Sequence, residues 1–209
     1  MQVWFASGNI HKKKELAAIL SASAPERAGW ELKIPSEAGF SFGPDETGST
    51  FLENALIKAV ELHRLLAEKG MLRRGDAVIA DDSGICVDAL EGRPGIHSAY
   101  YGNVKSGEEQ NALLLEELGD TATRSAYFVC AMVLYYSPDR FFVAQETFEG
   151  ELVKEAQGKG GFGYDPILYI PALGRTVAEL TEDEKNSISH RGKAGKTIAN
   201  ILFSNLLSD

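Results

Sequence analysis

Apolar residues along the chain alternate between short continuous runs and stretches with helical spacing. QVWFA (2–6) is typical of a buried strand, and it breaks at SGN (7–9). HKKKELAAILSA (11–22) then places Leu16, Ile19 and Leu20 on one helical face. Further runs rich in Val, Phe and Tyr predict strands at AVIA (77–80), YFVCAMVLYY (127–136) and FFVAQETFEGELV (141–153).

Three helix starts carry Ser or Thr with Glu three residues later, the spacing of a capping box. The pairs are Thr50 with Glu53, Ser106 with Glu109, and Thr181 with Glu184. Gly70 and Gly119 end the first two helices, and a last helix begins near 190 with Ile198, Ile201, Leu202 and Leu206 on its inner face. Helices and strands alternate at first and two long strands then follow each other, which predicts an α/β domain with a mixed sheet.

Composition and charge narrow the class of protein. The 209 residues suffice for one large domain or two small ones, and the formal net charge is −9. An acidic surface repels a polyphosphate backbone, so nucleic-acid polymers are disfavoured, whereas a local cationic pocket can still bind a small phosphorylated ligand.

Cys86 and Cys130 lie in apolar runs, as buried thiols do in a reducing compartment. The start MQVWFASGN lacks signal-peptide features and the apolar run 126–136 is too short for a membrane helix, so we expect a cytoplasmic protein.

Two glycine-rich stretches match nucleotide-binding patterns only superficially. GKGGFG (158–163) fits G-x-G-x-x-G, but YDPILYIP follows where the dinucleotide motif needs a helix. GKAGKT (192–197) resembles the end of a P-loop, but His190 stands where that motif requires glycine. Neither stretch predicts a phosphate site of that type.

Adjacent acids in IADDSGI (79–85) give the strongest chemical signal. We expect the strand to end before Asp81 and Asp82, where open α/β sheets place ligand groups. Like charges this close resist joint ionisation, and Mg²⁺ bound through few carboxylates plus substrate phosphates would relieve the conflict. Asp81 is expected to support the metal or its waters, and the plain alternative is a turn with a capping Asp.

Other polar stretches suit a phosphorylated ligand with a planar ring. SGNIHK (7–12) brings a helix start and Lys12 to an anion, or is a plain cap with solvated lysines. Lys58 sits at the edge of an apolar helix face and could point into a cleft, although a surface position is the commoner outcome for such a lysine. GGFGYDP (160–166) could offer an aromatic face on which a planar ring stacks. The alternative is a tight turn whose aromatic residues belong to the core. SHRGKAGK (189–196) could supply His190 and Arg191 as hydrogen-bond donors to carbonyl oxygens and ring nitrogens. The alternative is a solvated basic helix start.

Taken in order, these motifs resemble those of the inosine triphosphate pyrophosphatases. The matching stretches are SGN-x-x-K, E-T-G-x-T-F-x-E-N-A-x-x-K-A, A-D-D-S-G, G-R-P-G-I-x-S-A, G-G-F-G-Y-D-P and E-K-x-x-I-S-H-R-G-x-A, spread over about residues 3–203. The resemblance implies a single α/β domain over 1–209, elongated and two-lobed around a long mixed sheet, with the site in the cleft between lobes. It also implies Mg²⁺-dependent hydrolysis of ITP, dITP or XTP to the monophosphate and pyrophosphate, by a homodimer.

The same resemblance assigns roles to individual residues. Asp82 becomes the catalytic base and a metal ligand, Glu46 a second metal ligand, and Lys58 a catalytic cation that positions phosphate or water. The implied substrate-binding residues are Ser7, Gly8, Asn9, Ile10, His11 and Lys12 for the phosphates, and Ser83, Phe162, Gly163, Tyr164, Asp165, Lys185, His190 and Arg191 for the nucleoside.

Two alternatives stay open at this point. One is a nucleotide pyrophosphatase that acts on modified pyrimidine nucleotides. The other is a nucleotide sensor that binds without hydrolysis, although an intact DDSG together with Lys58 argues against it.

Overall fold

The computed structural model describes residues 1–25, 29–104 and 106–204. Helices and strands follow one another as the sequence pattern predicts, with short strands and 3₁₀ turns added between them. The elements are β1 (Gln2–Phe5), α1 (Ile10–Ser23), β2 (Glu31–Lys33), η1 (Pro35–Ala38), α2 (Phe51–Glu68), β3 (Ala77–Val87), η2 (Asp88–Leu90), η3 (Gly95–Asn103), α3 (Gly107–Leu118), β4 (Ser125–Ser137), β5 (Arg140–Leu152), β6 (Leu168–Ile170), β7 (Arg175–Thr176), η4 (Val177–Glu179), α4 (Glu182–Ile188) and α5 (His190–Ser204).

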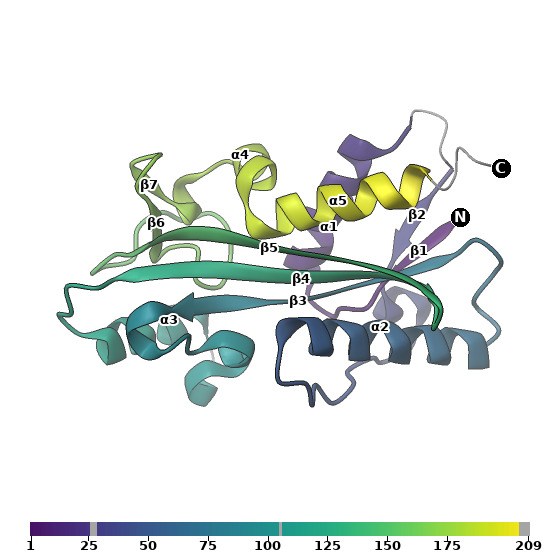
Figure 1. The fold of residues 1–209 in the computed structure, drawn as a ribbon, viewed down its shortest axis with the longest axis horizontal. Coiled ribbons are helices and arrows are strands. Elements are labelled where there is room, and N and C mark those ends of the chain that lie inside the picture. Colours follow the sequence, from purple (N-terminus) through teal and green to yellow (C-terminus); the bar gives the residue numbers. More distant parts are fainter. Residues whose placement is uncertain (26–28, 105, 205–209) are drawn as a thin grey trace. The chain divides into compact units, whose positions relative to one another are not determined.

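Seven strands pair in the order β2-β1-β3-β4-β5-β6-β7 (Figure 1). β1 is parallel to both β2 and β3, with Phe5 opposite Ile79, whereas β6 is antiparallel to β5 and β7. The sheet is therefore mixed, and the predicted α/β class is confirmed.

The chain groups into two compact units. The first contains Met1–Asp82, Cys130–Glu146 and the segment from Arg191 onward, and the second contains Ser83–Val129 and Thr147–His190. β3, β4 and β5 therefore each contribute residues to both units.

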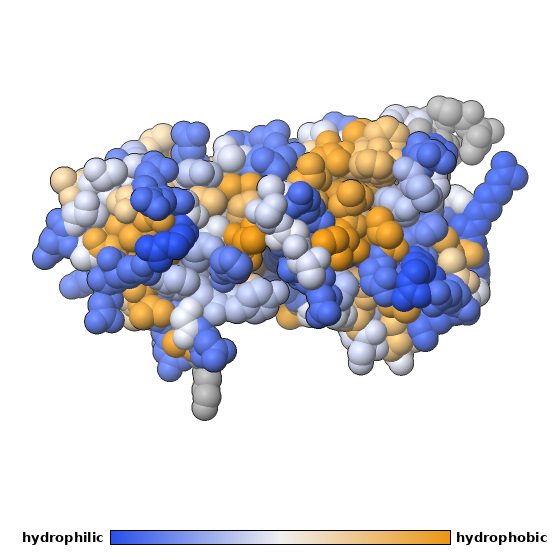
Figure 2. Space-filling model, turned by 60° about the horizontal axis from the view of Figure 1, so that its bottom comes forward, coloured by the Kyte–Doolittle hydropathy of each residue, from blue (hydrophilic) through white to orange (hydrophobic). Residues whose placement is uncertain are grey.

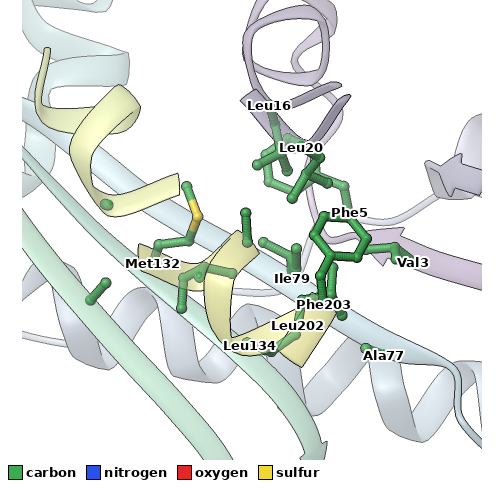
Figure 3. Packing of buried hydrophobic residues seen from close by; sticks show 14 of the residues in the cluster. Val3, Phe5, Leu16, Leu20, Ala77, Ile79, Met132, Leu134, Leu202 and Phe203 are labelled. Carbon is green, nitrogen blue, oxygen red and sulfur yellow. The ribbon is translucent and has the colours of Figure 1, made fainter. Parts of the chain in front are cut away.

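In the first unit, strand alternation sends side chains to two separate cores. Odd-numbered residues of β1 and β3 pack with α1 and α5, whereas even-numbered ones pack with α2 on the opposite face (Figure 1). Figure 3 shows the first of these cores, in which Leu16 and Leu20 of α1 and Leu202 and Phe203 of α5 meet the strand residues. Ile198 and Leu202 are fully buried, as predicted, while Leu206 lies outside the described residues.

The second unit has its own core. Leu114 and Leu118 of α3 pack with strand residues such as Ile85 and Phe128, and with Tyr164. Tyr164 follows the glycine-rich loop 160–163, so this core holds that loop at its aromatic end.

All three predicted capping boxes are confirmed. Each Ser or Thr hydroxyl accepts from the backbone N–H three residues on, while the Glu carboxylate reaches back to the N-cap N–H. GKAGKT lies inside α5, and GKGGFG is followed by turns and β6, so neither stretch forms the phosphate loop that it resembles. Both cysteines are buried and free, as predicted.

One predicted strand boundary is wrong. β3 does not end before the two acids but continues through Asp81, Asp82, Ser83 and Gly84 to Val87. Acidic residues are depleted in strands, so the local pattern favoured a turn. Here each carboxylate finds cationic partners on its own face of the sheet, and the strand can therefore continue.

The surface mixes polar and apolar residues. Figure 2 shows hydrophilic residues spread over the face in view, with hydrophobic ones gathered in patches between them. None of the helices in the described ranges has the length and apolar character needed to cross a bilayer.

Candidate functional site

The two adjacent acids of β3 point to opposite faces of the sheet. Ile79 belongs to the core with α1 and α5, and Ala80 belongs to the core with α2. Continuing the alternation, Asp81 faces α1 and α5, and Asp82 faces α2. Both carboxylates are buried, but each meets a different set of cations.

Asp82, Lys58 and Glu46 form the cluster on the α2 face. Lys58 Nζ donates to Asp82 Oδ1 at 2.8 Å and lies 3.3 Å from Glu46 Oε2. Lys58 is only 7% exposed, so the surface position that is commoner for such a lysine is wrong here. Burial lowers the pKa of Lys58, but the charges of Asp82, Asp81 and Glu46, together with the hydrogen bond to Asp82, outweigh burial and raise the pKa. The lysine is therefore a fixed cation.

The donor set of this cluster fits a hard divalent cation. Asp82 Oδ2 is buried and makes no hydrogen bond to any described residue, which leaves one carboxylate oxygen for another ligand. Glu46 is partly exposed beside the same ammonium. No group of three or more His, Cys, Asp or Glu among the described residues is placed to hold a metal alone. Two carboxylates with substrate oxygens completing the shell is the arrangement that Mg²⁺ prefers.

Asp81 anchors a second cluster on the α1 and α5 face. Lys12 Nζ lies 3.2 Å from Oδ1 and 3.1 Å from Oδ2, and Arg191 donates to Oδ2 through Nε and Nη2 at 3.2 and 3.0 Å. Arg191 Nη1 also donates to Glu15 Oε2 at 2.6 Å. Complete burial would raise the pKa of Asp81, but the charges of Lys12 and Arg191 hold that pKa well below its usual range.

The helix start at 7–12 is already partly capped. Asn9 is the N-cap of α1, and its Oδ1 accepts from the backbone N–H groups of His11 and Lys12 at 2.9 and 3.2 Å. These two donors are therefore engaged by the chain itself. What the segment offers an anion is the positive end of the helix, the close approach allowed at Gly8 and the ammonium of Lys12.

The glycine-rich loop of the second unit is organised around Asp165. Its Oδ2 accepts from Phe162 N at 2.7 Å and from Lys185 Nζ at 2.5 Å, and that ammonium lies 4.6 Å from the Phe162 ring centroid. Gly161 has φ +69°, and a Cβ there would lie 2.0 Å from Asp165 Oδ2. Only glycine permits this turn, so the loop presents one fixed aromatic face.

His190 and Ser83 lie in the second unit with this loop. The His190 imidazole stacks on Phe128 with ring centroids 4.8 Å apart, and it is 4% exposed. Ser83 is a half-buried residue of β3. Tyr164 donates its hydroxyl to Ser98 O at 2.9 Å, and burial raises the pKa of that hydroxyl.

Residues predicted for the site thus gather in three clusters. In the first unit, Lys12 and Arg191 meet at Asp81, and Glu46 and Lys58 meet at Asp82 on the other face of the sheet. In the second unit, Phe162, Asp165 and Lys185 meet.

Two polar residues of this arrangement were missed from the sequence. Glu15 holds Arg191 and could have been noticed because it lies one helical turn after Lys12. Asn111 is buried on α3 and donates to Gly163 O at 3.1 Å, for which the sequence carries no local signal.

Comparison with known proteins agrees with the fold and with these motifs. The model of the Ham1 family matches residues 3–201. The dITP/XTP pyrophosphatase of Treponema denticola is 45% identical, over 93% of this chain and 94% of the relative. The dITP/XTP pyrophosphatase of Nitrosomonas europaea is 41% identical, over 98% and 95%. The solved Ham1 protein of Staphylococcus aureus is 36% identical with a TM-score of 0.81, covering 98% of this chain and all of that one.

Paired carboxylates with cations on a strand of an open α/β sheet are suited to a ligand that carries phosphates and a divalent cation. The chain belongs to the Ham1 family, and the resemblance drawn from its motifs is confirmed.

Proposed function

We propose that the protein hydrolyses noncanonical purine nucleoside triphosphates, namely ITP, dITP and XTP, to the monophosphate and pyrophosphate with Mg²⁺. The observation that carries the proposal is the Asp82–Lys58–Glu46 cluster, in which Asp82 Oδ2 is buried and has no partner among the described residues. A carboxylate held by a fixed ammonium, with one oxygen to spare, is suited to orient a water molecule or to bind a metal ion. The names of the Treponema and Nitrosomonas relatives support the substrate class.

Asp82 and Glu46 would hold the Mg²⁺ ion, which when bound supplies positive charge to the triphosphate oxygens. Asp82 would also orient or deprotonate the attacking water, and Lys58 would hold that carboxylate in place and help to position water or phosphate. Ser7, Gly8, Asn9, Ile10, His11 and Lys12 would hold the phosphates at the start of α1.

Base selection is assigned to Ser83, to the loop from Phe162 to Asp165, and to Lys185, His190 and Arg191. Hypoxanthine and xanthine carry an acceptor oxygen at position 6, where adenine carries a donor amine. Donor groups around that position satisfy the oxygen but leave an adenine amine facing donors, a mismatch that can cost as much as about 10⁴-fold in specificity.

The test is a phosphate-release assay across a nucleotide panel with Mg²⁺. We expect ITP, dITP and XTP to be cleaved far better than ATP, with pyrophosphate as the second product. Arg191→Ala should lower ITP turnover and erode the preference for ITP over ATP. Equal specificity constants for ATP and ITP on the unmodified protein would refute the donor-pocket argument.

The same panel separates the two alternatives. A pyrimidine-directed enzyme would prefer dUTP or UTP to ITP, and a nucleotide sensor would bind ITP without releasing pyrophosphate. EDTA should abolish turnover, and restored activity with Mg²⁺ would identify the metal requirement.

The proposal includes assembly into a homodimer in the cytoplasm. Val60 and Phe141 are exposed apolar residues of the first unit. The Tyr135 ring of β4 meets His63 of α2 edge-on and stacks on Phe141 of β5, which links α2 to both strands. Two free buried thiols suit a reducing compartment. Sedimentation equilibrium tests the dimer, and Val60→Lys should weaken it if α2 lies at the contact.

A further inference from the structure

We propose that Asp81 is a positioning residue that holds Lys12 and Arg191 through one shared carboxylate, and that it is not a metal ligand. The inference rests on the proposed function and deepens it. It also replaces the expectation that Asp81 supports the metal or its waters.

Both oxygens of the Asp81 carboxylate are already bound by cations. Oδ1 accepts from Lys12, and Oδ2 accepts from both Nε and Nη2 of Arg191, while Lys12 Nζ also lies 3.1 Å from Oδ2. The Asp81 side chain is fully buried, so these cations enclose it. A metal ion at Asp81 would therefore have to displace an ammonium or a guanidinium.

The electrostatic contrast with Asp82 carries the second step. Asp81 is in contact with the ammonium of Lys12 and the guanidinium of Arg191. Both groups would repel an incoming divalent cation. Asp82 keeps one oxygen without a hydrogen bond and shares its lysine with a second carboxylate. Because the two side chains leave β3 on opposite faces, one metal ion near Asp82 and Glu46 lies on the face that Asp81 does not occupy.

The placement of the two cations gives the consequence. Lys12 lies in the first turn of α1 and Arg191 in the first turn of α5, and Asp81 joins them from the strand between. In the proposed function Lys12 faces the phosphates and Arg191 faces the base. Loss of the shared carboxylate should therefore disturb base discrimination as well as turnover, without changing the demand for metal.

The experiment compares Asp81→Asn with Asp82→Asn in two measurements. The first is the ratio of kcat/KM for ITP to that for ATP, and the second is the Mg²⁺ concentration at half-maximal ITP turnover. Asp81→Asn should lower the ratio by about tenfold, the size expected for losing one charged hydrogen bond, and leave the Mg²⁺ value unchanged. Asp82→Asn should instead raise the Mg²⁺ value.

The matched control is Asp76→Asn. Asp76 is also a buried carboxylate of the first unit, but its oxygens accept from the backbone N–H groups of Gln2 and Arg73. Both readouts should stay at the wild-type value in this variant. A raised Mg²⁺ requirement with an intact ratio in Asp81→Asn, or no change in either readout, would overturn the proposal. Failure of the proposed function itself would show earlier, as absence of ITP cleavage by the wild type.

Folding of Asp81→Asn is expected because Arg191 keeps Glu15, and the Lys12 side chain is 15% exposed and can reach water. Near-ultraviolet circular dichroism checks this. If the variant does not fold, Asp81→Asn/Arg191→Gln removes one charge of each sign, and Mn²⁺ binding is followed by the resonance signal of the free ion. Wild-type affinity for Mn²⁺ supports the positioning role, and weakened affinity overturns it.

Discussion

At the scale of residues, one strand gives two neighbouring carboxylates different surroundings. Asp81 is saturated by Lys12 and Arg191, whereas Asp82 shares Lys58 with Glu46 and keeps one oxygen without a hydrogen bond. The sequence indicated that DDSG carries chemistry and that the acids need cations. It could not say which acid meets which cation, because the partners come from α1, α2 and α5.

Asp82→Asn tests the proposed catalytic base. The amide has the same shape as the carboxylate but cannot accept a proton or bind a metal well. We expect ITP turnover to fall by about 10²–10⁴-fold, the usual contribution of a general base. Initial rates at saturating Mg²⁺ and ITP measure this, and circular dichroism checks the fold. Turnover close to the wild-type rate would remove Asp82 from the chemistry.

Lys58→Ala tests the buried ammonium. Removing it leaves Asp82 and Glu46 facing each other without the cation that both contact. We expect ITP turnover to fall, with no rescue by additional Mg²⁺. Lys154→Ala is the matched control, since the Lys154 side chain is 73% exposed and pairs with the exposed Asp120. Full activity in Lys58→Ala would mean that the ammonium is structural.

At the scale of elements, the sequence predicted those boundaries that depend on contacts between residues close together in the chain. The capping boxes at Thr50, Ser106 and Thr181 fixed three helix starts, because each is a contact within four residues. β3 could not be bounded in this way, since its acidic half is stabilised by residues far along the chain. The short strands β2, β6 and β7 could not be predicted from local sequence either, because each is defined by its pairing with a neighbouring strand.

Gly84 of β3 lies in close contact with Gly95 and Ser98 of η3. A Cβ at this position would lie 2.3 Å from Ser98 Oγ and 2.5 Å from Gly95 O. That hydroxyl accepts from Ile85 N at 2.9 Å and donates to Gly95 O at 2.6 Å, which fastens η3 to β3. The Gly-Ile-x-Ser stretch after Pro94 and the Ser-Gly-Ile of β3 are thus two sides of one contact.

Gly84→Ala should therefore destabilise the protein by about 1–3 kcal/mol, the usual cost of overpacking. Urea unfolding followed by fluorescence gives the free energy of unfolding. Gly43→Ala serves as the control, because a Cβ there meets nothing within 4 Å and the φ is not in the left-handed region. Equal stability of the two variants would contradict the close-contact argument.

At the scale of the whole molecule, paired carboxylates set the response to acid. A hydrogen bond from Arg175 lowers the pKa of Glu184 to about 2, and hydrogen bonds from Lys13 and Ser49 lower the pKa values of Glu37 and Glu53. Because the folded values lie below the unfolded value of about 4.3, these groups stabilise the fold above that pH. Their contribution is lost as the pH falls through the folded values.

We therefore expect the contribution of these carboxylates to the free energy of unfolding to decline from about pH 4.3 toward pH 2. Urea titrations at each pH measure the decline. Glu184→Gln should be less stable than the wild type at neutral pH and approach it near pH 2. A constant difference between the two proteins over this range would show that the Arg175 contact adds nothing to stability.

The last helix also determines when the first core can be completed during synthesis. α5 supplies Ala194, Ile198, Ala199, Leu202 and Phe203 to a core whose other buried members come from the first 79 residues and from β4 and β5. A nascent chain therefore carries an open apolar face until α5 has been synthesised and can pack against the sheet. Arg191 arrives with the same helix, so Asp81 lacks its guanidinium partner until α5 is in place.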